Sequence, residues 1–244
     1  MRRALALAIL LVPGLFLDAA LAQEKKQDPK KKPAPEPKTW MCKKGELMFE
    51  ENFEGGQLSK DWSSGKGDYK VEGDALKVAE VAADKHNAYK SRKVTDPNVI
   101  VQFSFKLDGC PWMGAAVDGS NHVSNLSLAA DSFKIRKMEG IGPTTKGTDV
   151  DQRRMKLNDG AWHTVVWEIY ADEMVATIDD KEMVLGKAEG ISMERNHLEL
   201  NSGGQFALYK EIKVWKAELD DKWPQKRAQL MQMLKKKPAA AAGK

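Results

Sequence analysis

The chain has 244 residues, of which 42% are hydrophobic and 30% charged, with two cysteines and a formal net charge of +4. This length accommodates one ordinary globular domain with additional segments. A mean hydropathy of -0.52 excludes a protein with many membrane spans, and two cysteines exclude a disulfide-dense scaffold.

The first segment has the pattern of a secretory signal peptide. Arg2 and Arg3 precede the apolar run 4–17, and a small-residue site occupies 20–22. We expect cleavage after Ala22 and export to the periplasm or the extracellular space. The alternative, a retained membrane anchor, is disfavoured because the run is shorter than the roughly 20 residues of a spanning helix. We therefore expect no stable membrane insertion after cleavage.

Residues 23–41 are rich in lysine and proline and lack any hydrophobic periodicity. Proline removes backbone donors and favours extended conformations, so this segment is expected to be a disordered linker. The segment carries a net charge of +3. The folded domain is expected to begin at Cys42 and to end at residue 219.

Within 42–219, short segments alternate between apolar and polar residues with a period of two. In 99–107, Val99, Val101, Phe103 and two further apolar residues share one face, whereas the other face is mostly polar. Turn sequences rich in Gly, Asn and Asp separate these segments. The strands expected on this basis are 46–52, 69–72, 75–79, 87–94, 99–107, 113–117, 122–128, 133–138, 162–170, 174–178, 182–185, 197–200 and 206–215. Many short strands without a long helix between them predict an all-β fold, an antiparallel β-sandwich of the jelly-roll kind.

Residues 220–244 are expected to form a short amphipathic α-helix and a basic tail. Trp223, Leu230, Met231 and Leu234 have the spacing of one helical stripe. That stripe either packs on its own domain or docks to a partner or an anionic surface.

The net positive charge belongs to the two ends of the chain. Residues 220–244 have a net charge of +5, whereas 42–219 hold 24 Lys and Arg against 29 Asp and Glu, a net charge of -5. An acidic domain without a basic stripe is a poor nucleic-acid binder, so no nucleic-acid partner is expected. The basic ends remain candidates for contact with an anionic envelope partner.

Several segments resemble concanavalin A-like, laminin G-like jelly rolls. The segments are Leu47 to Gly56, Leu58 to Trp62 and Tyr69 to Leu76 at the start, followed by 99–107, 160–169, 172–185 and 206–215. Together they are most similar to the bacterial 3-keto-disaccharide hydrolase domain. The resemblance implies a jelly-roll fold and sugar-related chemistry in an exported setting.

The chain departs from that family at two places. The segment 109–116 lacks the Asn and Ser that the family has after the central strand, and the loop 140–151 is short. The Glu-x-Asp-x-x-Glu run of related sandwich glycosidases is also absent from the sequence. The favoured function is therefore glycan binding without catalysis. Two alternatives stay open: hydrolysis of the glycosidic bond of 3-keto-disaccharides, and a structural role with an envelope partner.

Candidate ligand-binding residues lie on the polar face of the expected sheet and at its loop edges. They are His86, Gln102, His122, Asn125 and Arg136. Their side chains supply hydrogen-bond donors and acceptors for sugar hydroxyls, and Trp112 or Trp215 could stack on a sugar ring. The alternative is a solvated sheet face above core tryptophans. No catalytic residue is assigned.

Metal and disulfide chemistry is sparsely indicated. The four histidines are far apart in sequence, and no metal cofactor is predicted. Calcium could bind through Asp118 and Asn121, or through Asp149 and Asp151. The alternative is that these side chains only stabilise turns, which Asp and Asn commonly do. Export provides an oxidising setting. A disulfide between Cys42 and Cys110 is accordingly one of two equal alternatives, the other being two free thiols.

Overall fold

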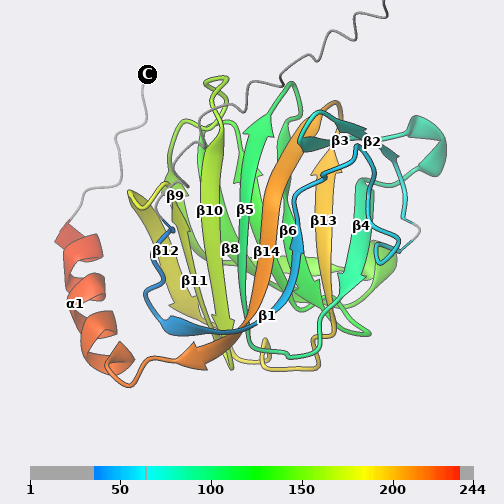
Figure 1. Cartoon of the computed structure of the whole chain (residues 1–244). Coiled ribbons are helices and arrows are strands. Elements are labelled where there is room, and N and C mark those ends of the chain that lie inside the picture. The colour runs from blue at the N-terminus through cyan, green and yellow to red at the C-terminus, as the bar shows by residue number, and fades with distance from the viewer. Residues whose placement is uncertain (1–35, 64, 237–244) are drawn as a thin grey trace, which may run out of the picture. The chain divides into compact units, whose positions relative to one another are not determined.

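The computed structural model describes residues 36–63 and 65–236 (Figure 1). The expected signal peptide, most of the linker and the tail after residue 236 lie outside the described residues. No helix of the described part is both long and apolar enough to cross a membrane.

Fourteen strands of the described chain form two sheets in which every paired neighbour is antiparallel. The larger, eight-stranded sheet has the order β12-β11-β10-β5-β14-β3-β2, and β1 also pairs with β14. Its strands are β1 (Cys42–Glu51), β2 (Asp68–Glu72), β3 (Ala75–Ala79), β5 (Val99–Leu107), β10 (His163–Tyr170), β11 (Glu173–Ile178), β12 (Glu182–Lys187) and β14 (Ala207–Leu219). The smaller, six-stranded sheet has the order β4-β13-β6-β7-β8-β9. Its strands are β4 (Ala88–Lys93), β6 (Trp112–Asp118), β7 (Ser124–Ala129), β8 (Ser132–Glu139), β9 (Lys146–Arg154) and β13 (His197–Gly203). The predicted jelly-roll β-sandwich is confirmed.

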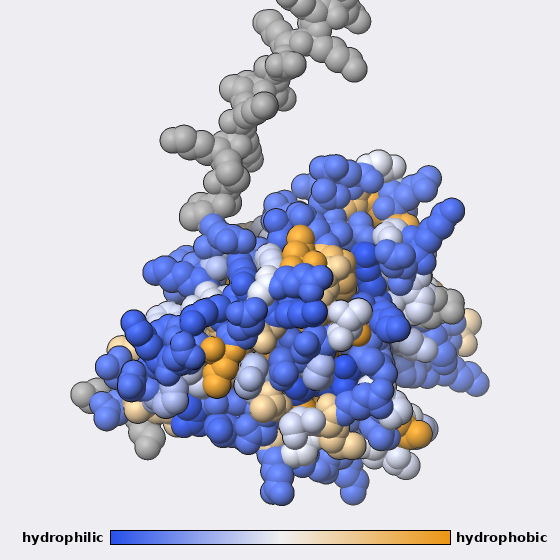
Figure 2. All heavy atoms as spheres, turned by 60° about the horizontal axis from the view of Figure 1, so that its bottom comes forward, coloured by the Kyte–Doolittle hydropathy of each residue, from blue (hydrophilic) through white to orange (hydrophobic). Residues whose placement is uncertain are grey.

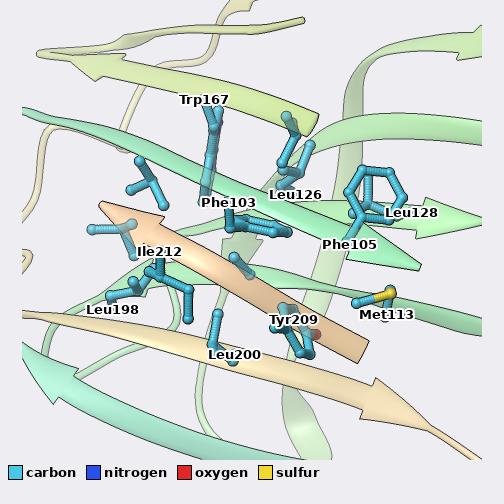
Figure 3. Close-up of a cluster of buried hydrophobic side chains, with 14 of the residues drawn as sticks. Phe103, Phe105, Met113, Leu126, Leu128, Trp167, Leu198, Leu200, Tyr209 and Ile212 are labelled. Carbon is cyan, nitrogen blue, oxygen red and sulfur yellow. The ribbon is translucent and has the colours of Figure 1, made fainter. Parts of the chain in front are cut away.

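The main core lies between the two sheets. Phe103 and Phe105 of β5 and Trp167 of β10 point from the larger sheet toward Leu126 and Leu128 of β7 in the smaller one (Figure 3). All five side chains have no exposed surface. This arrangement is the one that the alternation in 99–107 predicts, because every second residue of a strand faces the same side.

One strand was missed by the sequence analysis. Residues 140–151 were expected to form a loop, whereas β9 occupies 146–154 and pairs with β8. Two short 3-10 turns, Ala82–Asp84 and Gly142–Thr144, complete the connections. The reason for the miss is that β9 is an edge strand whose residues are exposed or half-buried on both faces. A strand without a buried face has no alternating hydrophobic pattern.

The outer face of the larger sheet carries a second apolar cluster, which the sequence analysis described as mostly polar. Ile100 and Trp215 on that face are buried beneath Met41 and the C-terminal helix α1 (Trp223–Lys236). Trp223 is 3% exposed, and its Nε1 donates to Glu173 Oε2 at 3.1 Å. Of the two alternatives for the helical stripe, the structure therefore shows packing on its own domain.

Glu168 fastens the start of β1 to the same outer face. Its carboxylate accepts the backbone N–H groups of Trp40, Met41 and Cys42 at 2.8, 2.9 and 2.7 Å. The buried carboxylate thereby satisfies three consecutive backbone N–H groups that no strand pairing serves. Trp40 and Met41, which the sequence analysis placed in the linker, thus pack against the sandwich.

The structure corrects the disulfide alternative, because Cys42 and Cys110 are both buried free thiols. Cys42 pairs with Leu219 at one end of β14, whereas Cys110 follows Leu107, which pairs with Ala207 at the other end. The length of β14 separates them by about 40 Å of strand, and a disulfide requires Cα atoms within about 7 Å.

The exposed large hydrophobic side chains of the described residues are scattered. They are Leu47, Ile141, Trp162, Met193, Leu219 and Met233. The face shown in Figure 2 is mainly hydrophilic, with hydrophobic residues in small separate groups. Single exposed hydrophobic side chains of this kind are normal for a folded domain.

Candidate functional site

A groove of about 600 Å³ crosses the outer face of the smaller sheet. One row across its floor runs from Glu199 on β13 through Ala116 on β6 and Asn125 on β7 to Arg136 on β8. The centre of the floor is low because Ala116 and its same-face neighbour Gly114 carry almost no side chain. Taller polar residues on both sides of this low centre form the walls.

An aromatic platform closes one end of the groove. The indole ring of Trp112 lies directly against the backbone of Gly203, where a Cβ atom would stand only 2.5 Å from the indole Nε1. Gly203 therefore allows the indole to lie close to β13. The Trp112 side chain is half-buried and contributes to the lining of the groove. An aromatic side chain held in place by backbone is suited to stacking on an apolar ring face.

Asp118 and His122 form a fixed pair at the other end. The Asp118 carboxylate is almost fully buried and accepts the backbone N–H groups of Val123 and Ser124 at 2.7 and 3.1 Å. Its second oxygen lies 2.8 Å from His122 Nδ1. This hydrogen bond raises the pKa of His122, and it orients the ring so that Nδ1 is engaged while Nε2 stays available.

Glu199 is the acidic side chain of the groove wall on the β13 side. Burial raises the pKa of its carboxyl, and the nearby Asp118 charge acts in the same direction. Its Oε1 accepts a hydrogen bond from Asn201 Nδ2 at 3.2 Å. A buried carboxyl of this kind holds its proton to a higher pH than a solvent-exposed glutamate does.

The opposite wall of the groove carries two basic side chains, and a carboxylate partly balances their charge. Lys134 Nζ and Arg136 Nε donate to the two oxygens of Asp149 at 3.0 and 2.8 Å. Asp149 has a lowered pKa, because the hydrogen bonds and charges of Lys134 and Arg136 together outweigh its desolvation. Both cations line the groove, and each has N–H donors that Asp149 does not engage.

Two buried polar atoms of the groove have no hydrogen-bond partner among the described residues. They are Asn201 Oδ1 and Thr145 Oγ1. A buried polar atom without a partner costs free energy, so it marks a place where a polar ligand atom is favourable. Beneath them, the fully buried Tyr209 hydroxyl lies 2.7 Å from the carbonyl oxygen of Asn201 and ties β13 to β6 through Gly114.

The structure brings four of the five predicted ligand-binding residues together. His86, His122, Asn125 and Arg136 all line the groove. Gln102 does not, because it lies on β5 in the larger sheet, where it is 8% exposed. Gln102 was predicted to share a face with residues that belong to the other sheet, because alternation identifies a polar face but not the sheet to which that face belongs.

Only one of the two tryptophans proposed for stacking lies in the groove. Trp112 lines the groove, whereas Trp215 is 7% exposed within the outer apolar cluster and lies beneath Lys44 Nζ at 4.3 Å from the ring centroid. Trp215 was therefore wrongly proposed as a stacking residue. Glu199, Asn201 and Thr145 were missed as site residues. Asn201 lies beyond the expected end of strand 197–200, and Thr145 lies in the expected loop 140–151. Glu199 lies within that expected strand, but the sequence does not show that the strand pairs with β6.

No group of three or more His, Cys, Asp or Glu side chains in the described ranges is arranged to hold a metal ion. Of the residues considered for calcium, Asp118 is engaged by His122 and two backbone N–H groups, and Asp149 by two cations. Asp151 Oδ2 accepts the N–H of Leu185 at 3.0 Å. These contacts are the ordinary structural roles of such side chains.

Comparison with known proteins gives a fold and no family. No protein-family model and no curated protein sequence matches the chain. The carbohydrate-binding module CBM66 from Bacillus subtilis has a TM-score of 0.51 at 12% identity, covering 64% of this chain and 96% of that one. LamA from Z. galactanivorans, solved with laminaritriose and laminaritetraose, has a TM-score of 0.53 at 11% identity, covering 71% and 100%. SCLam, a non-specific endo-β-1,3(4)-glucanase from family GH16, has a TM-score of 0.50 at 12% identity, covering 72% and 95%. At these identities the likeness shows a shared jelly-roll sandwich.

Proposed function

We propose that the groove of the smaller sheet binds a carbohydrate. The observation that carries the proposal is the Trp112 platform in the same groove as the unpartnered oxygen atoms of Asn201 and Thr145. Sugars combine an apolar ring face with a rim of hydroxyl groups, so an aromatic surface together with fixed polar atoms complements them. The proteins of similar fold include a module named for carbohydrate binding, which supports the same assignment.

The test compares two tryptophan variants. Trp112→Ala removes the platform, and Trp162→Ala is the matched control, because Trp162 is 37% exposed and is not part of the groove lining. We expect the wild-type chain and Trp162→Ala to bind the same glycans on an array at low salt, and Trp112→Ala to lose them. Equal binding by both variants, or the failure of the wild type to bind any glycan, would reject the proposal.

A second candidate function is hydrolysis of the glycosidic bond of 3-keto-disaccharides. One observation favours it: Glu199, whose raised pKa suits a proton donor, shares the groove with His122, whose free ring nitrogen suits a base when the ring is neutral. Glu199→Gln would then abolish turnover while leaving binding intact. The absence of turnover by the purified wild-type chain on these substrates would end this candidate.

We further propose that the chain is exported and cleaved after Ala22. The support is the basic, apolar and small-residue order of its first 22 residues. Expression of the full chain in a bacterial host, followed by mass spectrometry of the exported protein, should give a mature chain that begins at Gln23. Retention of residues 1–22 on the exported protein would contradict this.

A further inference from the structure

A second hollow adjoins the groove on the same face of the smaller sheet. It has a volume of about 430 Å³, and its lining residues are Asp61, Ser63, Ser91, Lys93, Asn196 and His197. Ser91 lies opposite the groove residue Glu199, and Lys93 lies opposite His197. Because residue pairs on one face follow each other at roughly 7 Å along a strand, the hollow begins where the groove ends.

The lining of this hollow is polar and held in place. Ser63 Oγ and Ser91 Oγ are 2.7 Å apart, and Asp61 accepts a hydrogen bond from Arg92 Nη2 at 2.7 Å. Lys93 is exposed and forms no ion pair or hydrogen bond among the described residues, so its ammonium group keeps three donors.

His197 adds an acceptor to these donors. Asn196 Nδ2 donates to Glu194, so the amide oxygen of Asn196 faces His197 Nδ1 at 2.9 Å as an acceptor. Nδ1 therefore carries the hydrogen. Burial lowers the pKa of His197, which favours the neutral ring, and in the neutral ring with hydrogen on Nδ1 the Nε2 atom is an acceptor. Hydroxyls, an ammonium donor and a neutral acceptor without an aromatic surface suit the hydroxyl rim of a sugar and not its ring face.

The distance along β13 indicates the size of the ligand. Gly203 lies under Trp112 at one end, and His197 lies six residues away at the second hollow. Six residues of strand span about 20 Å, which is the length of several sugar units.

We propose that the ligand is an oligosaccharide that stacks on Trp112 and continues along β13 into the second hollow. This inference rests on the proposed carbohydrate binding and deepens it by assigning chain length as the property that the site selects. A mono- or disaccharide would occupy the Trp112 end alone.

The test measures dissociation constants by calorimetry for β-1,3- and β-1,4-linked gluco-oligosaccharides, from the disaccharide to the hexasaccharide. Two or more added hydrogen bonds should make the wild-type affinity rise about tenfold between the shortest and the longest ligand of the series that binds. Ser91→Trp fills the hollow, and Lys93→Ala removes its free donors while changing an exposed side chain only. Both variants should lose most of this increase and keep the affinity for the disaccharide. Lys181→Ala, at an exposed lysine in the β11–β12 turn of the other sheet, should behave as the wild type.

The outcomes separate the two proposals. An affinity that depends on Trp112 but not on chain length would overturn the second hollow and leave carbohydrate binding in place. An increase that persists in both Ser91→Trp and Lys93→Ala would also overturn the second hollow. The failure of the wild type to bind any member of either series would overturn both proposals for glucans.

Discussion

Replacement of Glu168 by glutamine should remove a pH dependence from the stability of the sandwich. Glu168 has no exposed surface and is surrounded by the outer apolar cluster, so burial raises the pKa of its carboxyl from 4.5 to about 7 despite three backbone donors. The pKa in the folded chain is therefore higher than in the unfolded chain. The stability that this difference contributes is complete below pH 4.5 and is lost as the pH rises through 7.

The size of the effect follows from the difference between the two pKa values. Each unit corresponds to about 1.4 kcal/mol, so the wild type should lose about 3 kcal/mol of its free energy of unfolding as the pH passes from 4.5 to above 7. Glutamine has the same shape, stays neutral and still offers an oxygen to the backbone donors. The difference in stability between Glu168→Gln and the wild type should thus shift by about 3 kcal/mol in favour of the variant over this interval.

Urea unfolding at a series of pH values measures this difference directly, because groups that titrate elsewhere in the chain affect both proteins equally. Glu189→Gln is a suitable control, since Glu189 is an exposed glutamate in the loop after β12. A stability difference between Glu168→Gln and the wild type that stays constant from pH 4.5 to 8 would refute the reasoning. It would mean that the three N–H donors of residues 40–42 fully offset the cost of burying the charge.

Three further substitutions test the site and its support. Gly203→Ala places a methyl group 2.5 Å from Trp112 Nε1 and should displace the indole ring. Glycan affinity measured by calorimetry should then fall about tenfold, with little change in the free energy of unfolding. An unchanged affinity would contradict the role of Trp112 as a stacking platform. Tyr209→Phe removes a fully buried hydroxyl that lies 2.7 Å from the Asn201 carbonyl oxygen, and should cost about 1–3 kcal/mol in urea unfolding; an unaltered midpoint would show that the hydroxyl is dispensable. Trp223→Ala should lower the free energy of unfolding by about 3–5 kcal/mol and make α1 accessible to protease, without changing glycan affinity. If α1 of the variant resists protease as well as α1 of the wild type does, its docking on the sheet through Trp223 is contradicted.

The strand pattern could be predicted because burial on one face imposes a period of two. The segments around Phe103 and Val165 alternate clearly, and both lie in β-strands whose apolar side faces the core. β9 could not be found in this way, because its residues are not buried on either face. The outer cluster at Ile100 was missed for the opposite reason, since α1 and residues 40–42 cover a face that alternation alone describes as exposed.

The groove residues also divide into those that the sequence identified and those that it could not place. His86, His122, Asn125 and Arg136 were identified as polar residues at strand faces and loop edges, but nothing in the sequence placed Gln102 on the other sheet. Their assembly depends on strand order, and strand order depends on which distant segments pair.

The sequence by itself determined the all-β class, the short C-terminal helix and the separation of an acidic domain from basic ends, because these properties follow from local periodicity and composition. Only the tertiary structure decided that Trp112 lies against Gly203, that Glu199 stands in the same row as Asn125, and that the two cysteines are separated by the length of β14. Each of these relations joins residues far apart in the chain. Register and sheet order bring such residues together, and a single sequence read from end to end carries no direct signal of either.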